Sequence, residues 1–298
     1  MSSNLKGFGS TRSNSTVDMS GTQNFSERLA DFSTEFEKSK LGPAPRNPRL
    51  TGAMPDRETV VIDEELSVTA LTYAAPRTTS LGVILLLAHG AGGNQNSAFM
   101  VQFASGLSAL GLRTITFNFL YTEAGRRVPD RTPKLETCYR AVVRWVGNHA
   151  EQQPIFIGGK SMGARIASQV AAAPRPEDEA GTAAVDVAGV VALGYPLHPP
   201  GRPNQLRDSH LPRVATPMLV VQGSRDRFGT EAELRPVVAR MPSAELYLVE
   251  GGDHSLKVHR RSDASPEETS ANVMREIVRW VTAVVGCHRT ADRGPALH

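Results

Sequence analysis

Between residues 58 and 285 the chain alternates short apolar runs with longer segments of helical spacing. The runs predict strands at 58–64, 66–74, 82–88, 114–120, 155–157, 187–193, 218–221 and 246–249. The longer segments predict helices at 97–110, 133–149, 162–173, 231–241 and 269–285. Strands that alternate with helices favour a mostly parallel sheet with helices on both faces. We therefore expect an α/β fold.

The two ends of the chain lack this pattern. Residues 1–56 are rich in Ser, Thr, Asn and Gly, and only a short segment at 26–38 has helical spacing. Such a composition buries too little apolar surface to offset the entropy of ordering. Residues 287–298 are polar and contain Gly-Pro. We expect a largely disordered N-terminal extension at 1–56, one α/β domain at 57–286 and a flexible tail at 287–298.

Charge and composition exclude several classes of protein. The 33 basic and 30 acidic residues leave a net charge of only +3, and no basic run marks a nucleic-acid interface. No apolar run approaches the length of a membrane span, and the first residues of the sequence lack the apolar core that a signal peptide has. Cys138 and Cys287 lie far apart without a CxxC partner, as is typical of a reducing compartment. We expect a soluble, cytoplasmic protein that binds neither nucleic acid nor membrane.

The motif Gly159-Lys160-Ser161-Met162-Gly163 lies between a predicted strand and a predicted helix. In this context GxSxG predicts a sharp turn that exposes a nucleophilic serine, here Ser161, at the N-terminus of the helix. The alternative is a phosphate-binding loop, because Gly-Lys-Ser also ends GxxxxGK[ST]. That motif requires glycine at position 154, where the chain has Pro154. We therefore interpret the motif as a nucleophile turn.

A serine nucleophile needs a base, and the base needs an orienting carboxylate. Asp226 follows the predicted strand 218–221, and His254 lies in a glycine-containing loop after the next predicted strand. The chain order serine, acid, histidine is the order of an α/β-hydrolase. Asp253 is an alternative acid, but a residue adjacent to His254 in sequence seldom has the geometry to orient its ring. We predict Asp226 as the acid and His254 as the base.

A glycine-rich segment follows the predicted strand 82–88 and predicts an oxyanion hole. Glycines let a backbone approach a substrate and point N–H groups at its oxygen. We assign the two donors to the backbone of Ala91 and of Met162, the residue after the nucleophile. Gly90 allows the approach, and His89 is interpreted as an anchor of the loop rather than as a second base.

These motifs together resemble the dienelactone-hydrolase-like α/β-hydrolases. The resemblance is carried by HGAGG at 89–93, GGKSMGAR at 158–165, GSRD at 223–226 and GGDHS at 251–255. FNFLY at 117–121, GYPLHPPG at 194–201 and QLRD at 205–208 resemble a narrower branch, which contains testis-expressed protein thirty and subunit three of the NSL chromatin complex. The resemblance covers residues 82–285 and implies an α/β-hydrolase fold with about eight strands and no large lid domain. The dienelactone hydrolases themselves use a cysteine nucleophile, so a dienelactone substrate does not follow.

Several basic residues are candidates for substrate binding. Arg165 lies on the helix after the nucleophile, and Arg126, Arg127, Arg202 and His198 lie in predicted loops. Guanidinium groups at a pocket rim favour a substrate with a carboxylate or a phosphate. We keep an anionic substrate as a hypothesis.

The sequence therefore predicts a serine hydrolase that cleaves an ester, thioester or lactone of a small molecule through an acyl-enzyme. No HExxH motif, paired Cys/His cluster or dinucleotide glycine fingerprint is present, so we expect neither a metal nor an organic cofactor. Acyl transfer to an alcohol is a lesser alternative. The main alternative is a catalytically silent hydrolase-like interaction module, since the chromatin-associated relative is regarded mainly as a scaffold and fold does not imply function.

Overall fold

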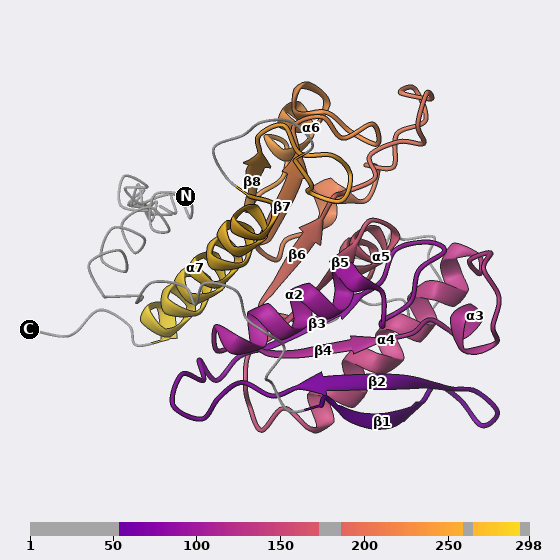
Figure 1. Ribbon diagram of the computed structural model, residues 1–298, viewed down its shortest axis with the longest axis vertical. Coiled ribbons are helices and arrows are strands. Elements are labelled where there is room, and N and C mark those ends of the chain that lie inside the picture. Colours follow the sequence, from indigo (N-terminus) through magenta and orange to yellow (C-terminus); the bar gives the residue numbers. More distant parts are fainter. Residues whose placement is uncertain (1–53, 173–185, 259–264, 293–298) are drawn as a thin grey trace, which may run out of the picture.

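The computed structural model describes residues 54–172, 186–258 and 265–292 (Figure 1). The predicted N-terminal extension, up to residue 53, lies outside the described residues. The described part forms one central sheet with helices packed on it (Figure 1). Within this part, no helix is both long enough and apolar enough to span a bilayer.

Eight strands make up the sheet, in the order β1-β2-β4-β3-β5-β6-β7-β8. Their bounds are β1 Asp56–Val61, β2 Ser67–Tyr73, β3 Ile84–Ala88, β4 Arg113–Phe117, β5 Ile155–Lys160, β6 Gly189–Leu193, β7 Met218–Gly223 and β8 Ala244–Val249. β2 pairs antiparallel with β1 and β4, and all other pairs are parallel. The structure thus confirms the predicted mostly parallel sheet.

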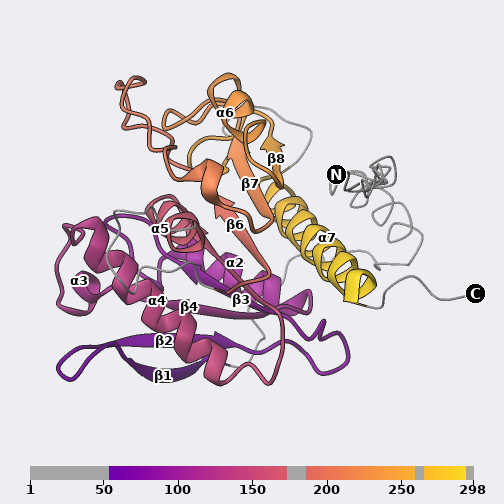
Figure 2. The ribbon, with the colours of Figure 1, turned by 180° about the vertical axis from the view of Figure 1, so that it is seen from behind.

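Helices cover both faces of the sheet, as predicted. The helices are α2 Ala98–Ala109, α3 Leu120–Glu123, α4 Thr132–Asn148, α5 Met162–Ala171, α6 Glu231–Val238 and α7 Pro266–Asp292. Figure 1 shows α2 and α7 in front of the sheet, and Figure 2 shows α4 and α5 on the opposite face. Side chains of β3 alternate between the two layers: Leu85 and Leu87 pack with α2 and α7, and Leu86 and Ala88 with α4 and α5. A strand buried on both faces reads as a continuous apolar run, which is why this strand is visible in the sequence.

The structure corrects some predicted boundaries. The predicted strand 114–120 ends at Phe117, because Phe119 caps the short helix α3, which the sequence reasoning missed. Helix α7 continues to Asp292, beyond its predicted end at 285 and into the predicted tail 287–298. After Gly286 the next helix-breaking residues are Gly294 and Pro295, so ordinary helix-forming residues fill the interval.

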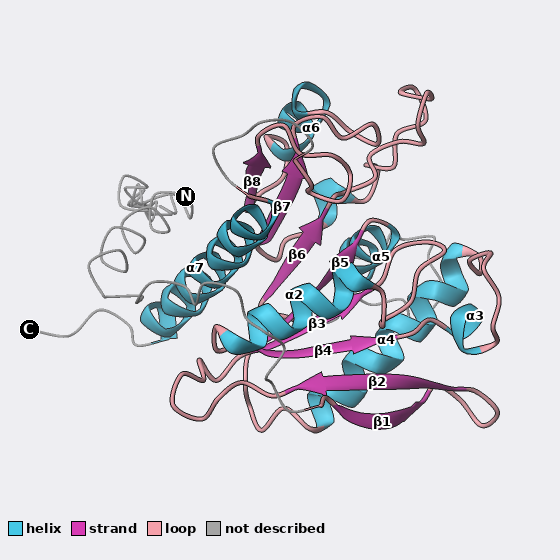
Figure 3. Cartoon of the chain, in the orientation of Figure 1, coloured by secondary structure: helices cyan, strands magenta, loops and turns pink. Residues whose placement is uncertain are grey.

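The segment between β6 and β7 carries no additional domain. Residues 194–217 form loops and a single 3-10 helix, η1 (Leu211–Arg213). The loops after β6 and β7 lie beyond the arrowheads of these strands (Figure 3). In an open parallel sheet this edge is where ligands bind. The absence of a lid domain in this segment agrees with the fold predicted from the sequence.

The turn from β5 into α5 is packed directly against backbone. A Cβ atom at Gly159 or at Gly163 would lie 2.3 Å from the carbonyl oxygen of Ala88. Backbone cannot move aside as a flexible side chain does, so these positions require glycine. The two glycines therefore let α5 begin directly against the end of β3.

We predict opposite effects on stability for two glycine-to-alanine substitutions in helices. Gly163→Ala places a methyl group against backbone and should lower the free energy of unfolding by about 1–3 kcal/mol. Gly147→Ala, in the last turn of α4 where nothing lies within 4 Å, should raise it by about 0.4–1 kcal/mol. Urea unfolding followed by circular dichroism measures both. Equal effects of the two substitutions would contradict this account of the turn.

Candidate active site

Ser161 occupies the turn between β5 and α5 in an unusual backbone conformation. Its φ is 52° and its ψ is −112°, a left-handed region that residues with a Cβ rarely adopt. The Ser161 N–H donates to the carbonyl of Leu193 at 2.9 Å, which holds the turn against β6. Strain of this kind persists only where the surroundings enforce it. The turn carries the hydroxyl beyond the sheet, at the N-terminus of α5.

Three side chains predicted from separate motifs meet at this point. His254 Nε2 lies 2.8 Å from Ser161 Oγ, and His254 Nδ1 lies 2.7 Å from Asp226 Oδ2. An ionised carboxylate only accepts hydrogen bonds, so Nδ1 carries the proton and donates it to Asp226. This tautomer leaves the Nε2 lone pair facing the Ser161 hydroxyl. The arrangement is that of a nucleophile, a base and an orienting acid.

The Asp226 carboxylate is fully buried and fully hydrogen-bonded. Its Oδ1 accepts the backbone N–H of Phe228 at 2.8 Å, and its Oδ2 accepts Gln222 Nε2 at 2.8 Å as well as His254. Gln222 in turn accepts the Tyr195 N–H at 2.7 Å. Sequence reasoning missed Gln222, although a polar residue at the end of the apolar strand β7 is a usable signal. The network prevents the carboxylate from turning away from His254.

His254 is held on three sides in the loop after β8. The Phe228 ring stacks on its imidazole, with centroids 4.1 Å apart and planes inclined by 27°. The Lys160 ammonium donates to its backbone carbonyl. Gly194, with φ of 65°, packs so closely that a Cβ there would lie 2.7 Å from both that carbonyl oxygen and Lys160 Nζ. The imidazole nonetheless keeps 23% of its side-chain surface exposed, so a substrate can reach it.

The alternative acid, Asp253, has a different place in the structure. Its Oδ1 accepts the backbone N–H groups of Ser255 at 2.7 Å and Lys257 at 3.0 Å. These are the hydrogen bonds of a turn formed by the residue's own loop. The carboxylate that reaches the imidazole is that of Asp226.

The glycine-rich segment after β3 lies against the nucleophile. A Cβ at Gly90 would be 3.5 Å from Ser161 Cβ, and Ala91 follows in an exposed turn. Met162 is the first residue of α5, and an N–H in the first turn of a helix has no partner within the helix. The oxyanion-hole assignment to Ala91 and Met162 stays a prediction.

His89 anchors this segment. Its Nε2 accepts the backbone N–H of Phe119 at 3.2 Å and lies 3.3 Å from Thr122 Oγ1, while its Nδ1 donates to the Gly90 carbonyl at 2.9 Å. These partners require the neutral ring, and burial lowers the pKa of His89. A neutral histidine with both nitrogens occupied fits a structural role rather than that of a base.

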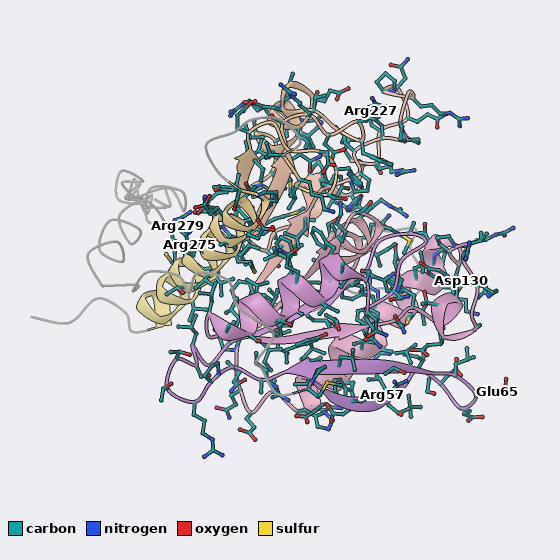
Figure 4. All side chains as sticks on the ribbon, in the orientation of Figure 1. Arg57, Glu65, Asp130, Arg227, Arg275 and Arg279 are labelled. Carbon is teal, nitrogen blue, oxygen red and sulfur yellow. The ribbon has the colours of Figure 1, made fainter. Side chains whose placement is uncertain are left out.

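The remaining candidate substrate contacts have different surroundings. Arg126 forms an ion pair with Asp130 at 2.7 Å, and Asp130 lies at the side of the molecule near α3 and α4 (Figure 4). His198 is buried, with Nδ1 2.9 Å from the Pro199 carbonyl and Nε2 3.2 Å from Glu233 Oε1. Two further arginines considered in the sequence are exposed, namely Arg127 and Arg202. Arg165 alone among these candidates has a backbone bond to the nucleophile, since its N–H donates to the Ser161 carbonyl at 3.1 Å.

Among the described residues, no group of three or more His, Cys, Asp and Glu side chains is arranged to bind a metal ion. The arrangement has the geometry to transfer a proton from the serine hydroxyl to the histidine, which is what attack of the serine oxygen on an electrophilic carbon requires.

Solved structures with a similar fold include several hydrolases. An alpha-beta serine hydrolase homologue from Coxiella burnetii has a TM-score of 0.59 at 21% identity, covering 76% of this chain and 97% of its own. A lidless a/b serine hydrolase from Xanthomonas campestris has a TM-score of 0.58 at 17% identity, covering 76% and 94%. Dienelactone hydrolase from Anabaena variabilis has a TM-score of 0.57 at 22% identity, covering 76% and 97%. At these identities the similarity shows the fold.

The sequence itself also matches a family model. The model describes an alpha/beta hydrolase domain, and it matches residues 82–282, from just before β3 to within α7. This range includes Ser161, Asp226 and His254 and covers more than half of the chain. The chain therefore belongs to the alpha/beta hydrolase domain family.

Proposed function

We propose that this protein is a serine hydrolase that cleaves an ester, thioester or lactone of a small molecule through an acyl-enzyme. The observation that carries the proposal is the continuous hydrogen-bonded chain from Ser161 Oγ through the His254 ring to Asp226, with distances of 2.8 and 2.7 Å. A serine hydroxyl becomes a good nucleophile when a base accepts its proton, and the base works best when a carboxylate fixes its tautomer.

The mechanism has two steps that use the same groups. His254 Nε2 takes the proton of Ser161 as Oγ attacks the carbonyl carbon, and the imidazolium then gives that proton to the leaving group. The backbone N–H groups of Ala91 and Met162 stabilise the oxyanion, each by roughly 3 kcal/mol. Water, deprotonated by the same histidine, then hydrolyses the acyl-enzyme. Asp226 stabilises the imidazolium in both steps.

The finer classification is also a proposal. The motifs at 117–121, 194–201 and 205–208 support membership of the branch with testis-expressed protein thirty and NSL complex subunit three. The serine at the nucleophile position argues against the cysteine chemistry of dienelactone hydrolases.

Cys138 and Cys287, the two cysteines of the sequence, are not joined to each other by a disulfide, which supports a cytoplasmic location.

We further propose that the substrate carries a negative charge, bound by Arg165. This residue lies one helical turn after Ser161, and its guanidinium bonds only the neutral Gln169 Oε1, at 3.2 Å, in the described part of the chain. Burial lowers the pKa of Arg165, and the nearby Arg207 cation lowers it further, against smaller opposing effects of Tyr195 and Glu136. Within the described ranges neither Arg165 nor Arg207 forms a salt bridge, and two neighbouring cations of this kind favour an anion from outside the chain.

Labelling with a fluorophosphonate probe tests the activation of Ser161. We expect the wild-type protein to be labelled and Ser161→Ala to remain unlabelled, because the probe reacts with a serine whose proton is accepted by a base. Circular dichroism establishes that both proteins are folded. A folded wild-type protein that resists the probe would contradict the hydrolase proposal and favour the interaction-module alternative. If labelling succeeds, hydrolysis of an ester panel with and without an alcohol acceptor separates hydrolysis from acyl transfer.

Two aspartate substitutions distinguish the orienting acid from its neighbour. Asp226→Asn removes the charge that stabilises the imidazolium and should lower kcat on an activated ester by about a thousand-fold or more. Asp253→Asn is the matched control and should change kcat by less than about ten-fold, because asparagine keeps the side-chain oxygen that accepts the turn hydrogen bonds from Ser255 and Lys257. The reverse ranking would assign the acid to Asp253.

Paired esters that differ only in charge test the role of Arg165. In Arg165→Met, KM for a carboxylate-bearing ester should rise by about ten-fold or more, the value of a lost charge-assisted hydrogen bond, while KM for the neutral ester stays unchanged. Arg144→Met, on the exposed surface of α4, serves as the control for net charge. Equal effects of Arg165→Met on both esters would refute the anionic substrate and leave the hydrolase proposal intact.

A further inference from the structure

Lys160 is a buried lysine immediately before the nucleophile. It is the last residue of β5, and only 8% of it is exposed. Its Nζ donates to the backbone carbonyl of His254 and lies 5.5 Å from the centre of the Phe99 ring on α2. In the described part of the chain no carboxylate forms an ion pair with it. A buried ammonium without a paired carboxylate is costly, so its presence here needs a reason.

The charged groups around Lys160 all belong to the catalytic loops. Asp226 faces it from the loop after β7, and Asp253 and His254 from the loop after β8, while α2 contributes only the apolar Phe99. Burial lowers the pKa of Lys160 to about 8, against the opposing attraction of Asp226 and Asp253.

The lowered pKa of Lys160 makes the stability of the fold depend on pH. Between about pH 8 and about pH 10.5 the folded chain binds fewer protons at this site than the unfolded chain, so stability rises with pH in that window. Below it, the buried charge destabilises the fold. The charge on Lys160 therefore costs stability at neutral pH, so stability gives no reason for a charged group at this position.

We propose that Lys160 is a positioning residue, which fixes the His254 loop through a charge-assisted hydrogen bond to the His254 carbonyl and so keeps Nε2 on Ser161. The inference rests on the proposed hydrolase function. Because Lys160 and Ser161 are adjacent in the chain, the hydrogen bond ties the backbone of the base directly to the backbone of the nucleophile. Gly194 leaves room for this hydrogen bond, because a Cβ there would lie 2.7 Å from both Nζ and the carbonyl oxygen.

Lys160→Met tests the proposal, because methionine keeps the length and apolar part of the side chain and removes the donor. We expect fluorophosphonate labelling to slow by about ten-fold to a hundred-fold, the cost of a misplaced base. The free energy of unfolding at pH 7 should stay equal or rise, since a buried charge is removed. Lys257→Met, an exposed lysine in the same loop, is the matched control and should label at the wild-type rate.

The pH dependence of the labelling rate supplies a second measurement. Wild-type labelling should slow as the pH passes through about 8, where Lys160 loses its proton, and Lys160→Met should lack that step. The Lys160 proposal is overturned by a variant that labels within about two-fold of wild type, by loss of labelling that tracks loss of stability, or by a wild-type rate that stays level through pH 8.

A measurement that does not depend on catalysis separates the role of Lys160 from the proposed hydrolase function. In proton NMR the Nδ1–H of His254, shared with Asp226, should give a far-downfield resonance in the wild type that broadens or disappears in Lys160→Met. If wild-type protein shows the resonance but is not labelled, the hydrolase proposal fails and the resonance of the variant still decides the role of Lys160. An unchanged resonance in the variant would overturn the positioning role.

Discussion

The buried carboxylate of Asp226 is the point on which the site depends. An unpaired buried charge would be strongly destabilising, so its two oxygens must find donors. They accept from Gln222, Phe228 and His254, and Gln222 also binds the backbone of Tyr195 after β6. The loops after β6, β7 and β8 are therefore joined through this carboxylate. The hydrogen bond that His254 donates to this carboxylate fixes the tautomer and the orientation of the imidazole. The imidazole in turn places its Nε2 lone pair against the Ser161 hydroxyl.

Much of this architecture is readable in the sequence, and the reason is physical. Strands buried on both faces are continuous apolar runs, and a sharp turn packed against backbone requires the glycines of GxSxG. The positions of Asp226 and His254 follow because parallel strands bring their carboxyl ends to the same edge. The sequence reasoning failed where an effect depends on tertiary contact or on weak local signals. The short helix α3 and the end of α7 are examples.

The residues that support the site, Gln222 and Lys160, could not be identified from the sequence, because their roles depend on tertiary contacts. Gln222 contacts a residue 27 positions away, and Lys160 contacts one 94 positions away. A contact between residues so far apart in the chain leaves no pattern in the sequence near either of them. Among the rim residues, the structure places Arg126 and His198 beside carboxylates, whereas Arg165 faces another arginine. No pattern in the sequence distinguishes a paired arginine from an unpaired one, since the partner is chosen by the fold.

The distribution of the three side chains along the chain has a consequence for synthesis. Ser161 leaves the ribosome well before Asp226 and His254, and β7 and β8 must both dock before the hydrogen-bonded chain exists. β8 is an edge strand, and α7, the last element, covers the neighbouring strands. Domains are completed from the N-terminus during synthesis. A nascent chain that stops before His254 thus contains the serine turn without the imidazole, so under the proposed function Ser161 gains its base only after β7, β8 and the loop that follows have been made.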